Sequence, residues 1–286
     1  MKYTPRLPES NDNVTPTSPL KDFFIMAGGL LVIIVGVYLA LGFAVDLIVP
    51  RLSPEIEKKM AGSLLAMKDG TPGDPAMTGS LQSLLDRLQN GCTHLPYAFR
   101  VHVYRDKKIN ALAMPGGHIV VFTGLLDKVL SENELAFVLA HELGHYAHRD
   151  HLRGMGRALV FMAMSAFIFG PDSRVGGMLS HGLKLTEMRF SRHQETRADE
   201  FALDAVHCLY GHVAGATDFF HRIAGAQDPG AFGHYFSTHP ENQRRIDHLE
   251  TIIGEKRFGM GKKSPLPADL KGRMAGASPP QTSFNP

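Results

Sequence analysis

An uncharged, apolar run from Phe23 to Val45 constrains this chain more than any other segment. Charged residues border it, with Lys21 and Asp22 before it and Asp46 after it. As a helix, the run is long enough to cross about 30 Å of hydrocarbon. A cleaved signal peptide is the alternative, but its apolar core is shorter, begins nearer to the first residue and precedes a small-residue cleavage site. We therefore expect a single uncleaved transmembrane anchor, which makes the lipid bilayer a partner.

The remaining composition is that of one folded domain with extensions. With 286 residues, of which 44% are hydrophobic, the chain can bury a substantial core. Lys plus Arg (30) nearly balances Asp plus Glu (28), so no overall field favours nucleic acid as a partner. Two cysteines, Cys92 and Cys208, are too few for a disulfide scaffold or a four-thiolate zinc site. Either one disulfide or two free thiols remains open.

Segment composition divides the chain into four parts. The first residues are rich in Pro, Ser, Thr and Asn, and the last in Gly, Pro, Lys and Ser. Such compositions bury too little apolar surface to order themselves. We expect a flexible N-terminal tail over 1–21, the anchor over 22–49, a folded domain over 50–258 and a disordered C-terminal tail over 259–286.

Local signals predict a mainly helical domain that contains one small sheet. Ser53-Pro54-Glu55 begins a helix to about Met67, because Ser favours the N-cap and Pro the first helical position. Pro and Gly make residues 69–79 a loop, and alternating and β-branched runs between Ala98 and Thr123 predict strands. Further helices are predicted at Ser80–Asn90, Leu183–Val206, His212–Ala224 and Glu241–Ile253.

Two more helices are predicted in the middle of the chain. Ser131 opens a capping box with Glu134 and apolar residues follow, which predicts a helix over Glu132–Arg149. The apolar segment Ala158–Phe169 is too short to span a bilayer as a straight helix. This length favours a buried core helix over membrane contact.

The helix predicted over 132–149 carries the sequence His141-Glu142-Leu143-Gly144-His145. Positions four apart share a helix face, so His141 and His145 can direct two imidazoles at one divalent metal while Glu142 projects beside them. The alternative, a solvated helix face, leaves the surrounding apolar residues unexplained. The motif therefore predicts a metal site.

A catalytic zinc takes three protein ligands and keeps one position open for water, so a third ligand must come from elsewhere. Glu195 and Asp199 are again four apart, on a predicted helix. One carboxylate can bind the metal while the other supports a ligand. Alternatively, both pair with nearby arginines on a surface helix. Taken alone, this segment favours the second interpretation.

Four ordered matches give the chain a resemblance to a known family. They are Asn110-Ala111 leading to Pro115-Gly116-Gly117, the His141 motif, the block from Phe190-Ser191-Arg192 to Asp199, and Ser237-Thr238-His239-Pro240 followed by Arg245-Ile246. From about Pro50 to Phe258 the chain resembles the integral-membrane gluzincin family of zinc metallopeptidases. This family includes the CAAX prenyl protease, the bacterial heat-shock membrane protease and the mitochondrial inner-membrane quality-control protease.

The resemblance implies an α+β, mainly helical zincin-type domain with a small sheet, an active-site helix and one Zn²⁺ per chain. It implies that Glu195 is the third ligand and that Asp199 supports a ligand histidine. It also makes His239 a contact for the transition-state oxyanion. A turn histidine before a helix-opening Pro240 is the alternative for His239.

The resemblance also implies where substrate binds. The strand near His118–Phe122 is expected to pair with an extended substrate. Asn110, Gly117 and His118 are the expected substrate-binding residues.

Two departures from the family narrow these expectations. A single sure membrane span cannot form the enclosing chamber of the CAAX protease, which argues against farnesylated peptides as substrates. Many relatives carry His five residues after the second ligand, where this chain has Asp150 flanked by His148 and His151. We expect these two histidines to be cations at a helix C-terminus, outside the metal site.

These features predict a membrane-anchored zinc endopeptidase in which Glu142 is the general base for a metal-activated water. Its expected substrates are proteins or peptides in membrane or envelope quality control. The alternatives are a zinc-stabilised scaffold without turnover and a metal-free membrane-anchored interaction domain. A large domain after one anchor favours a bacterial inner-membrane protein with an extracytoplasmic catalytic domain, but the flanking charges do not orient the anchor. Those charges are Lys2, Arg6 and Lys21 before it and Arg51, Lys58 and Lys59 after it.

Overall fold

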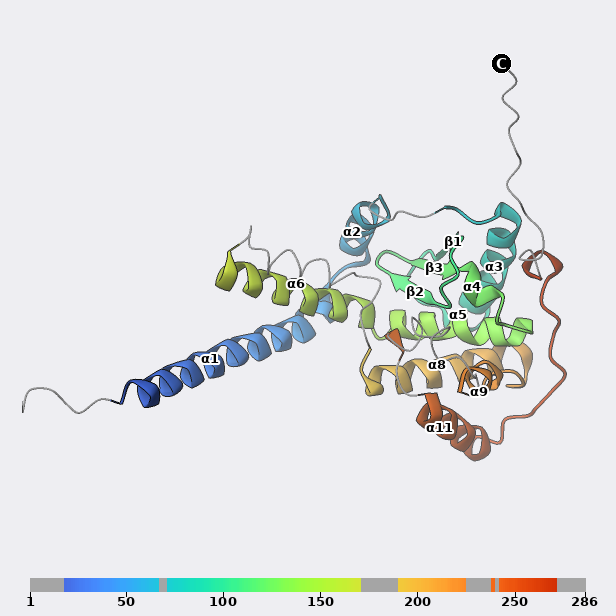
Figure 1. The fold of residues 1–286 in the computed structure, drawn as a ribbon. Helices are drawn as coiled ribbons and strands as arrows, with labels where there is room; N and C mark the ends of the chain where they lie inside the picture. Colours follow the sequence, from blue (N-terminus) through green and yellow to red (C-terminus); the bar gives the residue numbers. More distant parts are fainter. Residues whose placement is uncertain (1–17, 67–70, 171–189, 225–237, 240–241, 272–286) are drawn as a thin grey trace, which may run out of the picture.

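Two long apolar helices extend from a domain built of a small sheet and several helices (Figure 1). The structure is a computed structural model that describes residues 18–66, 71–170, 190–224, 238–239 and 242–271. Helix α1 (Pro19–Ile48) contains the predicted anchor and buries none of its residues. Helix α6 (Asp150–Phe169) lies beside it. Both helices are long and apolar enough to cross a membrane, by length and composition.

Helix α6 corrects the expectation of a buried core helix over 158–169. Phe167 is 91% exposed, and Leu159 and Phe169 are each more than half exposed. The apolar segment is only the second part of a longer helix, which begins at Asp150. Its 20 residues span about 30 Å.

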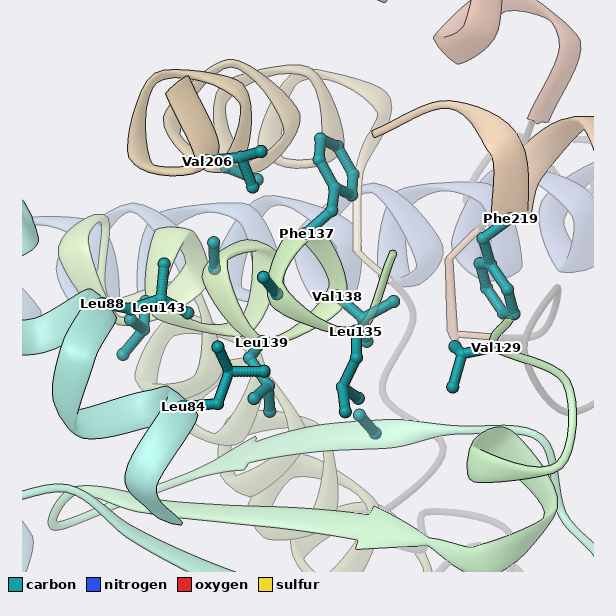
Figure 2. Close-up of a cluster of buried hydrophobic side chains, with 14 of the residues drawn as sticks. Leu84, Leu88, Val129, Leu135, Phe137, Val138, Leu139, Leu143, Val206 and Phe219 are labelled. Atoms are coloured by element: carbon teal, nitrogen blue, oxygen red, sulfur yellow. The ribbon is translucent and has the colours of Figure 1, made fainter. Parts of the chain in front are cut away.

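Helix α5 (Glu132–Ala147) is the central element of the domain. Its residues from Asn133 to Tyr146 are all buried, because the sheet lies on one side of it and α8 (Arg192–Tyr210) on the other (Figure 1). Figure 2 shows Leu139 directed towards the sheet and Phe137 towards α8. A helix enclosed in this way is a rigid support for the polar side chains that it carries.

The sheet has the strand order β1-β3-β2. Strand β1 (Arg100–Tyr104) is parallel to β3 (His118–Phe122), and β2 (Ala111–Met114) is antiparallel to β3. Strand β3 is therefore central, and β2 is the edge strand that packs on α5. This arrangement confirms the predicted mainly helical fold with one small sheet. The remaining elements are η1 (Val49–Arg51), α2 (Pro54–Ala66), α3 (Pro75–Leu88), η2 (Gln89–Thr93), α4 (Thr123–Leu126), α9 (Asp218–Ala224), α11 (Asn242–Glu255) and η5 (Ala268–Leu270).

Several helix boundaries differ from prediction because capping residues set them. Helix α3 begins at Pro75, where Oδ1 of Asp74 accepts a hydrogen bond from the N–H of Ala76 at 2.9 Å, so the predicted loop over 69–79 is too long. Helix α5 ends before Arg149, whose φ of 55° is left-handed. Helix α8 begins after Ser191, which forms a capping box with Gln194. The predicted residues 183–189 of that helix lie outside the described residues, and α9 begins at Asp218 rather than His212.

The segment after α11 packs on the domain, so the predicted disordered tail is wrong for residues 259–271. The N–H of Ser264 donates to Oδ1 of Asn133 at 2.7 Å, and the N–H of Glu132 donates to the carbonyl of Ser264 at 3.1 Å. Leu266 and Leu270 are buried. Two apolar side chains and a few backbone hydrogen bonds therefore order a segment whose average composition is polar.

Cys92 and Cys208 form a disulfide, with their Cα atoms 5.9 Å apart. The bond joins η2 to the C-terminal end of α8, across 116 residues of sequence. The alternative of two free thiols, which the sequence left open, does not hold in this structure.

Candidate metal centre and active site

The predicted metal-binding motif lies where α8 packs against α5. A Cβ atom added at Gly144 would lie 2.8 Å from the Cα of Ala198. Glycine on α5 and a small residue on α8 therefore allow the two backbones to approach this closely. The approach brings Glu195 and Asp199 of α8 next to the histidines of α5.

Four buried side chains have ligand atoms within 4.8 Å of one another, namely those of His141, His145, Glu195 and His239. The Nε2 atoms of His141 and His145 lie 3.1 Å apart, and each lies 3.6 Å from an oxygen of Glu195. Tetrahedral zinc with bonds to nitrogen of about 2.0–2.1 Å places its ligand atoms about 3.3–3.4 Å apart. The observed separations fit such a site, so this cluster can hold a metal ion.

The charges around the cluster also fit a divalent cation. Four buried carboxylates surround it, those of Glu142, Asp150, Glu195 and Asp199. Two guanidinium groups contact them, those of Arg245 and Arg197. Among the described residues these carboxylates outnumber the guanidinium groups that contact them, and an excess of buried negative charge favours a divalent cation. In addition, Oε2 of Glu142 is buried without a hydrogen-bond partner among the described residues. A divalent metal would compensate the negative charge, and a water molecule on it would give Oε2 of Glu142 a hydrogen-bond partner.

Each histidine of the motif has a carboxylate on its other ring nitrogen. Nδ1 of His141 lies 2.9 Å from Oδ1 of Asp199, and Nδ1 of His145 lies 3.2 Å from Oδ2 of Asp150. A carboxylate there keeps the proton on Nδ1 and leaves Nε2 free to bind a metal. Burial raises the pKa of both aspartates, but Arg245 beside Asp199 and His145 beside Asp150 outweigh it and hold each pKa below its usual value. Both aspartates are therefore ionised acceptors.

The ligand groups themselves have shifted pKa values. Burial lowers the pKa of His141. Burial acts in the same direction on His145, but hydrogen bonds with Asp150 and Glu195 outweigh it and raise that pKa to about 9. Burial raises the pKa of Glu195, yet His239 and Arg245 hold it well below its usual value. Glu195 is therefore ionised, as a metal ligand must be.

Two residues of the site were not assigned a role from the sequence. Asp150 is fully buried and also accepts from Nε2 of Gln194 at 3.0 Å and Nη2 of Arg197 at 3.2 Å. Arg245 donates from Nε and Nη2 to Asp199, both at 2.7 Å, and its Nη1 lies 2.7 Å from Oε2 of Glu195. The only sequence signals were the departure at Asp150 and the place of Arg245 in the last family match.

His239 lies inside the cluster. Its Nδ1 is 3.0 Å from Oε1 of Glu195 and 3.3 Å from Nε2 of His141, and its Nε2 is 3.8 Å from Oε1 of Glu142. The neighbouring backbone is fixed by a hydrogen bond from the N–H of Phe190 to the carbonyl of Thr238 at 3.1 Å. The structure thus brings His239 to the predicted base and the predicted third ligand.

The three expected substrate-binding residues make structural contacts. Oδ1 of Asn110 accepts from Oγ1 of Thr238 at 3.4 Å, next to His239. The hydroxyl of Tyr146 on α5 accepts from the N–H of Gly117 at 3.1 Å and donates to the carbonyl of His118 at 3.0 Å. These contacts join the sheet to the active-site helix and to the segment that carries His239.

The expectation that residues 118–122 pair with an extended substrate is wrong. Strand β3 already pairs with β1 along one edge and with β2 along the other. The backbone groups of β3 are therefore occupied. Strand β2 lies at an edge of the sheet and packs on α5.

His148 and His151 lie outside the metal cluster, as expected. Nδ1 of His148 lies 2.8 Å from the carbonyl of Gly144 at the end of α5. His151 differs from expectation, because it is buried in the first turn of α6 with its ring centre 4.3 Å from that of Tyr146. It belongs to the packing between α5 and α6 and lies in the first turn of a helix rather than at a helix C-terminus.

Comparison with known proteins agrees with this geometry. The sequence model described as "Peptidase family M48" matches residues 75–253. Metalloprotease LoiP of Escherichia coli (strain K12) is 30% identical over 186 residues, which cover 62% of this chain and 71% of that protein. Metalloprotease YcaL of the same organism is 29% identical over 180 residues, or 60% of this chain and 68% of that protein.

A mitochondrial protein gives a similar match. The mitochondrial metalloendopeptidase OMA1 of Schizosaccharomyces pombe is 32% identical over 167 residues, which cover 55% of this chain. The match spans 47% of that relative, which is less than half of its length.

Proposed function

This chain belongs to peptidase family M48, and from that premise we propose that it hydrolyses peptide bonds with one zinc ion held by His141, His145 and Glu195. Family membership makes it a metalloendopeptidase that acts on proteins or peptides. The observation that carries the zinc assignment is the meeting of two Nε2 atoms and a carboxylate at separations of 3.1 to 3.6 Å. Zinc suits this set of two imidazoles and one carboxylate.

The chemistry requires an activated water, a base and a proton donor for the leaving amine. Bound zinc would supply a Lewis acid that lowers the pKa of water towards about 7. Glu142 adjoins the ligand set and has an oxygen without a partner among the described residues. We assign Glu142 to accept the proton from the attacking water and to pass it to the leaving nitrogen.

His239 is assigned to the oxyanion. Catalysis needs an open coordination position, so His239 cannot serve as a fourth permanent ligand in the working enzyme. Its Nε2 lies on the side of Glu142, 3.8 Å from Oε1, where the scissile carbonyl must be attacked. Stabilising the developing charge there is the role that the geometry supports. Asp199, Asp150 and Arg245 act by holding the ligands in place.

The alternative of a zinc-stabilised scaffold is not favoured. A structural zinc site has four protein ligands and no need of a base. Here Glu142 is buried beside the ligands with an oxygen that has no hydrogen-bond partner in the described part of the chain, and a purely structural site does not offset the free-energy cost of this burial.

We place the activity in membrane or envelope protein quality control, on the extracytoplasmic side of the membrane. Helix α1 supports attachment to a membrane. The Cys92–Cys208 disulfide supports the extracytoplasmic side, because disulfides persist in oxidising compartments and are rare in the cytosol. A reporter fused after the folded domain would test the side.

The test of the catalytic assignment is Glu142→Gln in the full chain. We expect bound zinc to remain stoichiometric while cleavage of an unfolded protein substrate falls by at least about 100-fold, the usual contribution of a general base. Glu200→Gln is the matched control, because Glu200 lies on α8 and pairs at the surface with His248 at 2.8 Å. Full cleavage by the zinc-loaded Glu142→Gln protein would show that Glu142 is not the base.

A further inference from the structure

The apolar end of α6 is exposed in the described structure. Four large apolar residues there are exposed, namely Leu159, Phe167, Ile168 and Phe169. Exposed apolar residues gathered in one half of a helix mark a site of contact with a membrane or a partner. Its position on the molecule indicates which of these covers it.

Helix α6 is fastened to α1 at the point where both helices leave the domain. A Cβ atom at Gly156 would lie 2.5 Å from Cγ1 of Val45, so the two helices touch there. Asp46 of α1 pairs with Arg153 at 3.0 Å and with Arg157 at 2.9 Å. A glycine at the crossing and a charged cluster beside it are features of packed membrane helices near the interface.

A second set of bonds fixes the start of α6 to the segment that follows α1, namely η1 and Leu52. Nη1 of Arg149, the residue before α6, donates to the carbonyls of Val49 at 2.9 Å and Leu52 at 2.6 Å. The direction of α6 relative to α1 is therefore set by the protein itself. Figure 1 shows the two helices extending to the same side of the domain.

The charged cluster divides α6 into a polar and an apolar part. All charged residues of α6 precede Ala158, and residues 158–169 contain none. The 12 steps from Arg157 to Phe169 cover about 18 Å, which exceeds half of a hydrocarbon core of about 30 Å. With Asp46 and both arginines at the level of the head groups, residues 158–169 are long enough to reach deep into the hydrocarbon.

We propose that residues 158–169 of α6 are inserted in the bilayer beside α1, with the Asp46–Arg153–Arg157 cluster at the membrane surface. The hydrocarbon of the lipid is the occupant of the exposed face, because α6 packs on α1, which is apolar and buries none of its own residues. The chain is thus attached to the membrane at two points of its sequence.

The second attachment sets the position of the metal centre. Asp150, the first residue of α6, contacts Nδ1 of His145 at 3.2 Å. Only His148 and Arg149 separate α6 from the helix that carries the motif. The centre is therefore held close to the membrane surface, and the substrate class is protein segments that adjoin the bilayer. This last consequence rests on the proposed function, whereas the insertion of α6 does not.

Tryptophan fluorescence tests the insertion directly, because the chain contains no Trp. Three full-length variants, each in liposomes, carry one Trp: Phe167→Trp at the end of α6, Val32→Trp in α1 as the lipid-exposed reference, and Leu130→Trp on the domain as the aqueous reference. All three positions are at least 66% exposed. Phosphatidylcholine with brominated acyl chains is the quencher for lipid contact, and acrylamide is the quencher for water contact.

We expect brominated lipid to quench Phe167→Trp at least half as strongly as Val32→Trp, and to leave Leu130→Trp almost unquenched. Quenching of Phe167→Trp by acrylamide alone would show that α6 lies in water and would overturn the proposal. Quenching by neither agent would show that protein, such as a second copy, covers the face, and would also overturn it. The two proposals fail separately. A wrong catalytic assignment would appear in the cleavage assay with Glu142→Gln and would leave the quenching of Phe167→Trp unchanged.

Discussion

Each histidine of the α5 motif is oriented by an aspartate from another element. The role of one aspartate could be predicted from the sequence, and the role of the other could not. Asp199 belongs to a recognisable block with Glu195, so its role was expected. Asp150 was not assigned, because its contact with His145 depends on the left-handed residue Arg149, which turns the chain between α5 and α6. A turn of this kind has no sequence signature when the residue is arginine.

Replacing Asp150 with Asn should weaken zinc binding. The change removes the charge that holds Nδ1 of His145, and such outer contacts typically contribute about 10- to 100-fold to metal affinity. The measurement is a zinc competition titration with a chelator, with circular dichroism to show that the fold is kept. Asp247→Asn on the surface of α11 is the control and should leave the affinity unchanged. Equal zinc affinity in the Asp150 variant and the parent would contradict the role.

Buried Glu57 on α2 should make part of the stability depend on pH. Burial raises its pKa, but the hydroxyl of Tyr97 at 2.8 Å and the ring of His151 at 3.5 Å outweigh burial and lower the pKa below its ordinary value of 4.5. The folded state thus binds this proton less readily than the unfolded chain. The contribution to stability is present above pH 4.5 and is lost as the pH falls through the lower folded pKa.

Glu57→Gln tests this effect by urea unfolding at neutral pH and below pH 4.5. We expect the variant to be less stable than the parent at neutral pH and the difference to shrink in acid. Glu255→Gln, at an exposed end of α11, is the control. A difference that stays constant with pH would assign the effect to packing alone.

At the scale of elements, the approach of α5 and α8 assembles the ligand set. Two short motifs separated by about fifty residues meet only because Gly144 admits the backbone of Ala198. The spacing within each helix was readable from the sequence, since residues four apart share a face. The distance between the helices was not, because it depends on side-chain volume at their contact.

Gly144 is not a metal ligand, but Gly144→Ala should disturb the metal centre. The added methyl would lie 2.8 Å from the Cα of Ala198, so α8 must move and carry Glu195 with it. We expect a loss of about 1–3 kcal/mol in the free energy of unfolding, typical of overpacking, together with weaker zinc binding. Gly79→Ala on α3, which has no neighbouring atom within 4 Å, should be neutral or stabilising. Unchanged zinc affinity in Gly144→Ala would contradict this account.

At the scale of the whole molecule, the Cys92–Cys208 disulfide and the helix pair α1 and α6 constrain the domain from two sides. The disulfide fastens the far end of α8 to η2, while its near end carries the metal ligands. Helices α1 and α6, which we propose to lie in the membrane, extend from the opposite side of the domain. The metal centre lies between these two constraints.

Removing the disulfide should lower global stability. A cross-link across 116 residues restricts the unfolded chain, and loss of a native disulfide typically costs about 2–5 kcal/mol. The double variant Cys92→Ser, Cys208→Ser should unfold at lower urea concentration than the oxidised parent. A reductant should bring the parent to the midpoint of the variant and leave the variant unchanged. No effect of the reductant on the parent would show that the bond does not form.

The sequence by itself determined the features that depend on short-range periodicity and local chemistry. These are the anchor helix, the small sheet, the cap at Ser131, the face shared by His141 and His145, and the similar pair Glu195 and Asp199. The family resemblance joined the two pairs, and family membership agrees with it.

Only the tertiary structure decided the features that depend on contacts between distant segments. These are the central place of β3, the exposed end of α6, the order in residues 259–271, and the positions of Asp150 and Arg245 around the ligands. Each depends on which surfaces meet, and neither composition nor periodicity specifies that, because the same apolar stretch can face lipid, a sheet or another helix.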